Sequence, residues 1–292
     1  MNNWLANYIM RGRLEAMTVA STLALLSLLF PPVNVVSSAS VALVTLRRGA
    51  YEGGIILACS VLVTALLGFF FVGNYQFILL YSLLLWLPVW LISIVLREGK
   101  HLSLAIEIAT LLGALGVLGF YGFEPDAAAF WKSVFDVMLP QTAPLDIQKM
   151  LAVMSHYMTG IVAAGSVASL LFGLFLGRWW QAQLYNVGGF KRDFLSLQSQ
   201  VSVALLSMAI VIIALASTGL SAEIAWNVCI LILVLYAFIG TAILHAWFAS
   251  NSQGRYMVIM FYVTLILIPH AVLLVALVGL TDPWLNLRKQ KK

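Results

Sequence analysis

Few residues of this chain could take part in chemistry, and most of them lie inside or beside long apolar segments. Glu107 is the one acid clearly inside such a segment. A carboxylate at that depth is costly unless it is paired, protonated or hydrated. Two interpretations are open: Glu107 contacts a ligand or a proton, or it is an interfacial acid paired with Arg97, Lys100 or His101.

Isolated polar residues near the other apolar segments are further candidates for a ligand pocket. A lone histidine or asparagine is more often structural, because the fold usually satisfies buried polar groups. Histidine also binds ligands and carries protons near neutral pH. The candidates are Asn34 in the first outer loop, His156 and Tyr157 at the start of a segment, Asn227 within a segment, and His270 directly after Pro269.

Sequence patterns of catalytic, metal-binding or nucleotide-binding sites are missing. The chain has no HExxH, GxSxG, GxxxxGK or CxxC motif. We therefore predict no catalytic residue, no metal site and no cofactor, and we do not expect an enzyme. Energised transport by this chain would need a partner ATPase.

The composition is that of a membrane protein. Of the 292 residues, 62% are hydrophobic and 9% are charged, whereas a soluble domain carries about 25% charged residues. We predict an all-α, polytopic bundle of transmembrane helices. Its candidate spans are 14–30, 36–46, 55–72, 76–96, 102–120, 155–176, 201–220, 224–248 and 256–280. The net charge of +5 comes from loops and the tail, so nucleic acid is not an expected partner.

The positive-inside rule orients these segments. With a cytoplasmic N-terminus, ten Lys and Arg residues lie inside and six outside, and four of those six are in the tail from Arg288 to Lys292. Either nine spans are real and the basic tail lies outside, or one segment does not cross. Segment 36–46 and the C-terminal half are the candidates for the segment that does not cross. The sequence leaves eight or nine spans open.

Two longer polar segments separate the apolar ones. The outer segment 121–154 has an amphipathic helical pattern at 130–138, and Pro144 can begin a second helix. It is either a packed cap over the bundle or a moving lid over a ligand. The inner segment 178–200, with a helical pattern at 190–197, is either an anchor for anionic lipids or a docking surface for a cytoplasmic partner.

Small residues recur every four positions on the first apolar helix, at Ala16, Ala20 and Ala24. A face of methyl-sized groups lets another helix approach closely within a membrane. This face either docks another subunit or packs inside the protein.

Three stretches resemble the YybS-like family of uncharacterised bacterial membrane proteins. The first is the turn Leu46-Arg47-Arg48-Gly49 with Gly53-Gly54, which follows a small-residue helix and a proline loop. The second is GRWWQAQLYNVGGFKRDF at 177–194, and the third is the tail with Gly279, Asp282, Trp284 and Arg288. The family is similar to the S components of energy-coupling-factor transporters, which capture substrates.

The resemblance implies an S-component-like bundle over 1–180 and additional helices with a basic tail over 181–292. In S components a small-residue face on the first helix docks the energising subunit, which places that role on Ala16, Ala20 and Ala24. The expected function is a ligand-capturing or transport-associated subunit of the bacterial inner membrane. Its expected partners are membrane lipids, a small or lipid-like ligand and energising subunits. The alternative is a non-transporting scaffold or assembly factor.

Overall fold

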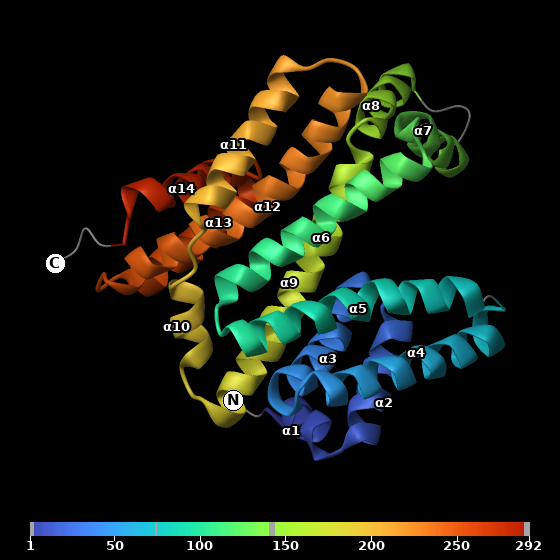
Figure 1. Cartoon of the computed structure of the whole chain (residues 1–292), viewed down its shortest axis with the longest axis vertical. Helices are drawn as coiled ribbons and strands as arrows, with labels where there is room; N and C mark the ends of the chain where they lie inside the picture. The colour runs from blue at the N-terminus through green and yellow to red at the C-terminus, as the bar shows by residue number, and fades with distance from the viewer. Residues whose placement is uncertain (1–2, 74, 140–143, 289–292) are drawn as a thin grey trace. The chain divides into compact units, whose positions relative to one another are not determined.

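The computed structural model describes residues 3–73, 75–139 and 144–288, and this part of the chain is all-α (Figure 1). The described residues form fourteen α-helices and one short 3-10 helix, η1. The all-α architecture predicted from the composition is thereby confirmed.

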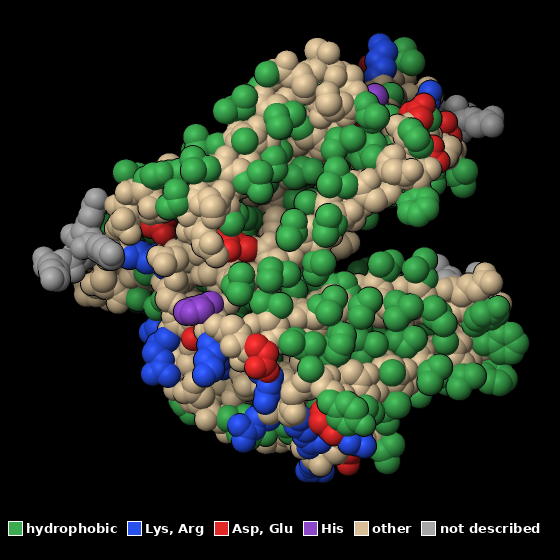
Figure 2. Space-filling view, viewed as in Figure 1, with side chains coloured by type: hydrophobic (Ala, Val, Ile, Leu, Met, Phe, Trp, Pro, Cys, Tyr) green, Lys and Arg blue, Asp and Glu red, His purple; other side chains and the backbone are tan. Residues whose placement is uncertain are grey.

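Five helices are long and apolar enough to cross a membrane core of about 30 Å. They are α4 (Ala50–Val72), α5 (Tyr75–Gly99), α6 (Leu102–Phe123), α9 (Met158–Tyr185) and α12 (Leu220–Ala249). Three shorter apolar helices are α11 (Val201–Ala216), α13 (Gly254–Leu267) and α14 (Ala271–Leu285). Many large hydrophobic side chains are exposed, as contact with lipid requires (Figure 2). These helices indicate a multi-pass membrane protein.

Contacts between residues divide the chain into two compact units. Unit 1 comprises Met1–Ala109 and Ala168–Phe194, and unit 2 comprises Thr110–Val167 and Leu195–Lys292. The boundaries fall inside α6 and α9 and at the last residue of α10 (Gly189–Leu195), so these helices contribute to both units.

Unit 1 is built around α3 (Asn34–Arg48), in which every residue from Ser37 to Leu46 is buried. Its neighbours are α1 (Trp4–Arg11), α2 (Arg13–Leu26), η1 (Pro31–Val33), α4 and α5. Small side chains bring α3 close to α2, and their hydroxyls need partners in an apolar interior. Ser37 donates a hydrogen bond to the carbonyl of Ala20 (2.7 Å) and accepts one from the indole of Trp86 (3.1 Å).

The alanine face of α2 lies inside unit 1. Ala16 and Ala20 are fully buried and Ala24 is 1% exposed, in the same core as residues of α3 and α4. Helices α3 and α4 both pack against α2. In this arrangement the chain's own helices cover the three alanines.

Unit 2 contains the outer segment and the C-terminal helices. The pattern at 130–138 belongs to α7 (Ala127–Met138), and Pro144 precedes α8 (Leu145–Ser155), as predicted. Asp126 caps α7 by accepting a hydrogen bond from the amide of Ala129 (3.0 Å). The inner segment contains α10 (Gly189–Leu195), where a helix was also predicted.

Helices α13 and α14 are short, as α2 and α3 also are. Their 14 and 15 residues correspond to about 21–22 Å at 1.5 Å per residue. The chain breaks between them at 268–270, where Pro269 interrupts the helix. Gly240 of α12 and Gly279 of α14 allow a close crossing, because a Cβ on either would overlap the backbone of the other helix.

The chain beyond α14 is bound to the linker between α10 and α11. Arg288 donates a hydrogen bond to the carbonyl of Leu195 (2.9 Å) and another to that of Leu197. Because α11 and α12 are consecutive helices that pack together, this linker lies near the end of α12, where α13 begins. The α13–α14 pair thus enters and leaves at the same end of the α11–α12 pair.

Candidate functional site

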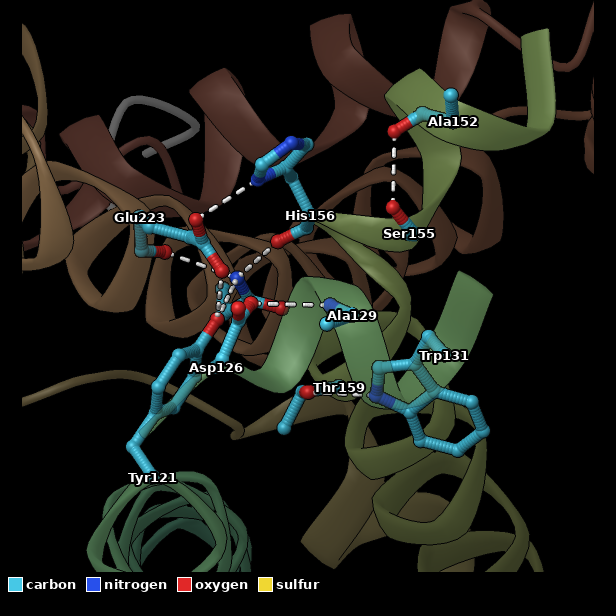
Figure 3. Close-up of polar contacts among 10 residues, drawn as sticks. Tyr121, Asp126, Ala129, Trp131, Ala152, Ser155, His156, Thr159 and Glu223 are labelled. Atoms are coloured by element: carbon cyan, nitrogen blue, oxygen red, sulfur yellow. Dashed lines mark hydrogen bonds and ion pairs between the residues drawn. The ribbon is translucent and has the colours of Figure 1, made fainter. Parts of the chain in front are cut away.

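The best-developed polar site lies in unit 2, at the first turns of α12. We call it the Glu223 cluster, and it consists of Tyr121, His156, Glu223 and Asn227 (Figure 3). These residues come from the end of α6, the turn between α8 and α9, and α12. The site therefore forms only when three separate segments come together.

Glu223 is placed by the start of α12. Gly219, at φ +66°, ends the preceding turn, and Glu223 follows in the first turn of the helix. A carboxylate is favoured there by the partial positive charge at a helix N-terminus. One oxygen of Glu223 accepts a hydrogen bond from the hydroxyl of Tyr121 (2.9 Å), and the other faces Nδ1 of His156 (2.8 Å).

Asn227 joins the helices behind this pair and is fully buried. Its Nδ2 donates to the hydroxyl of Tyr121 (3.1 Å) and to the carbonyls of His156 (2.7 Å) and Glu223 (2.8 Å). Its Oδ1 accepts a hydrogen bond from the amide of Gly160 (2.5 Å). Both ends of the amide therefore have partners in the protein, and Asn227 positions the cluster.

Gly160 allows α9 to approach α12 at this point. A Cβ at this position would overlap the backbone of Asn227. Glycine is needed at position 160 because the two backbones must come close enough for the amide of Gly160 to reach the Asn227 side chain.

Helix α7 is attached beside the cluster by an aromatic group. The indole of Trp131 donates a hydrogen bond to Thr159 of α9 (2.8 Å), three residues after His156. The same indole stacks on Phe120 of α6, with centroids 5.9 Å apart. The outer segment is thus bound to the helices that carry Tyr121 and His156.

The chemistry of the cluster is determined by the pairing of a carboxylate with an imidazole. An ionised carboxylate only accepts hydrogen bonds, so Nδ1 of His156 carries the hydrogen that faces Glu223. In an uncharged imidazole this tautomer leaves the Nε2 lone pair for an incoming group. The His156 side chain is 52% exposed and that of Glu223 is 20% exposed, so the pair can be reached from outside the protein.

The other residues predicted for a pocket are distributed over both units. Asn34 begins α3 in unit 1, where its Oδ1 accepts a hydrogen bond from Ser169 (2.9 Å). Glu107 also belongs to unit 1 and is partly buried in α6. Tyr157 is exposed beside His156, and His270 is an exposed residue that precedes α14. Of the six predicted residues, His156 and Asn227 are joined by a hydrogen bond.

Sequence reasoning missed Glu223 and Tyr121. Glu223 lies one residue before the apolar segment predicted at 224–248, and its hydrogen bonds cross 67 and 102 positions of sequence. A usable signal was present, since Glu223 and Asn227 are four residues apart and lie on one face of a helix. Among the described residues, no three His, Cys, Asp or Glu side chains are grouped so that they could hold a metal ion.

Known protein families, curated proteins and solved structures were each compared with this chain, and none matches it. The resemblance to the YybS-like family stays a prediction.

Proposed function

We propose that this chain is a multi-pass protein of the bacterial inner membrane with eight spans and a cytoplasmic N-terminus. The spans are α2, α3, α4, α5, α6, α9, α11 and α12, followed by α13–α14 as a re-entrant hairpin. The contacts of Arg288 with Leu195 and Leu197 support this arrangement, because they hold the tail beside the inner linker. The basic tail then agrees with the positive-inside rule.

In this topology the Glu223 cluster lies at the outer end of the bundle, beside α7 and α8. We propose that it captures a small ligand that donates a hydrogen bond or a proton, and that the chain acts with partner proteins. The observation that supports this function is the partly exposed Glu223–His156 pair, held by the buried Asn227. Ionisable groups in transmembrane segments are rare and usually functional. Partner subunits would supply energy, since the sequence contains no nucleotide-binding motif.

Native mass spectrometry of the protein, purified gently from its own membrane, tests the proposal. We expect a bound small molecule on the wild-type chain and at least a tenfold lower occupancy on Glu223→Gln, which removes the charge of the carboxylate. The matched control is Glu52→Gln in unit 1, where Glu52 pairs with Arg13 at 2.5 Å. Occupancy should be unchanged in the control.

Equal occupancy in wild type and Glu223→Gln would contradict ligand capture at this cluster. A wild-type protein that carries no small molecule would favour the alternative of a non-transporting scaffold or assembly factor.

A further inference from the structure

Unit 1 holds two kinds of arginine, which differ in what their guanidinium groups contact. Arg13 pairs with Glu52 at 2.5 Å, Arg97 with Glu98 at 3.5 Å, and Arg178 with Asp193 at 2.7 Å. The second kind has no carboxylate within ion-pair distance among the described residues. It comprises Arg11, Arg47, Arg48 and Arg192, all of them exposed.

The contacts that hold these four arginines are with neutral groups, although the charge of Arg48 also acts on the carboxylate of Glu52. Arg47 lies over the ring of Tyr185, with its guanidinium carbon 4.0 Å from the centroid. Arg48 donates a hydrogen bond to the carbonyl of Met10 (2.6 Å). Arg11 lies over the ring of Tyr8 at 5.7 Å, and Arg192 donates to the side chain of Asn186 (3.2 Å).

The same contacts arrange the four arginines as neighbours. Arg47 and Arg48 are consecutive residues at the end of α3. Arg48 contacts Met10, which is adjacent to Arg11 in α1. Arg47 contacts Tyr185, which is adjacent to Asn186, and Asn186 accepts a hydrogen bond from Arg192. The exposed cations of three segments are therefore brought to one end of unit 1, where Figure 2 shows Lys and Arg side chains gathered.

Such an arrangement is suited to bind an anion. A ring face, a carbonyl or an amide orients a guanidinium without neutralising its charge. The guanidinium then still has N–H donors for a ligand. Several adjacent positive charges repel one another unless an anion lies between them. Guanidinium groups bind phosphate oxygens with charge-assisted, often bidentate hydrogen bonds.

We propose that Arg11, Arg47, Arg48 and Arg192 form a binding site for the phosphate headgroup of an anionic phospholipid. Exposed aromatic and apolar residues next to these arginines support a lipid as the source of the phosphate. Tyr185 is 45% exposed and Trp4 of α1 is 65% exposed, as is typical of residues at the membrane interface. The site belongs to unit 1 and does not depend on ligand capture at the Glu223 cluster.

The test measures phospholipid bound to the full-length protein by native mass spectrometry, with phosphatidylglycerol and phosphatidylcholine offered in equal amounts. The wild type should retain phosphatidylglycerol preferentially. Because each basic residue near a membrane surface changes affinity for anionic lipid by about fivefold, Arg47→Gln with Arg48→Gln should lose most of this preference. The control Lys132→Gln with Lys149→Gln removes the same charge from α7 and α8 of unit 2 and should retain it.

Two further measurements test folding and the source of the phosphate. Arg47→Lys with Arg48→Lys keeps the charge and should restore much of the preference. Its melting temperature should equal that of the wild type. An unchanged preference in the double glutamine variant would overturn the site. A double lysine variant that keeps more of the preference than the glutamine variant and less than the wild type supports a site that uses both charge and guanidinium geometry. Displacement of the lipid by excess glycerol phosphate would show a site for soluble phosphates and overturn the assignment to a phospholipid.

Discussion

Asn227 is the residue on which the geometry of the Glu223 cluster depends most. Replacing it with alanine leaves the buried amide of Gly160 and the partly buried carbonyl of His156 without their partner. Each buried unsatisfied group costs about 1–3 kcal/mol, so we expect Asn227→Ala to be destabilised by about 2–4 kcal/mol. Thermal unfolding in detergent measures this loss. Asn251→Ala removes one exposed hydrogen bond and should change stability by less than about 0.5 kcal/mol.

Two glycines of α9 provide a matched pair. Gly160→Ala places a methyl group into the backbone of Asn227, whereas a Cβ at Gly165 meets nothing within 4 Å. We expect Gly160→Ala to cost about 1–3 kcal/mol through overpacking. Gly165→Ala should be neutral or stabilising by up to about 1 kcal/mol, because alanine favours the helix. Equal melting temperatures for the two variants would contradict the close approach of α9 and α12.

At this scale the sequence identifies polar residues but does not reveal which of them meet. His156 and Asn227 could be selected because they interrupt apolar segments. Their link through Glu223 and Tyr121 depends on how α6, α9 and α12 pack, and that packing has no local signature. Asn34 was selected by the same reasoning and instead bonds Ser169 within unit 1.

At the scale of the elements, α2 is held to its neighbours through small residues. Ala20 is fully buried, and its carbonyl accepts a hydrogen bond from Ser37 of α3. We expect Ala20→Leu to overpack the core of unit 1 and to cost about 1–3 kcal/mol. Thr18→Leu, on the exposed side of the same helix, is the control and should melt close to the wild type. A stable Ala20→Leu protein would contradict the burial of this face.

The re-entrant hairpin α13–α14 predicts the side of the membrane on which the chain ends. A green fluorescent protein fused after Lys292 should fluoresce, and alkaline phosphatase fused there should be inactive, because both report a cytoplasmic tail. The phosphatase inserted after Ser133 in α7 should be active and serves as the control for the outer side. An active phosphatase at the C-terminus would contradict the hairpin and favour nine spans.

The existence of most elements was predictable, and their depth in the membrane was not. Apolar runs locate α4, α5, α9 and α12, because hydrophobicity over a span is a property of local sequence. The segment predicted at 256–280 is one continuous run in the sequence but forms two short helices. Pro269 marks the break, yet only the contacts of Arg288 with the α10–α11 linker indicate that the chain turns back.

At the scale of the whole molecule, the two units carry different features. Unit 2 carries the Glu223 cluster beside α7 and α8, and unit 1 carries the exposed arginines Arg47 and Arg48 at the end of α3. The hydrophobic side chains exposed along the helices are accounted for by lipid contact in both units.

The most direct test of ligand capture is an experimental density map of the wild-type protein in lipid nanodiscs, from a sample in which mass spectrometry detects a bound small molecule. We expect non-protein density within hydrogen-bond distance of Nε2 of His156, beside the carboxylate of Glu223. The same map of Glu223→Gln should lack that density while the helices of unit 2 remain in place. Density for the bound molecule elsewhere in the protein, with protein side chains filling the space at His156, would contradict the account.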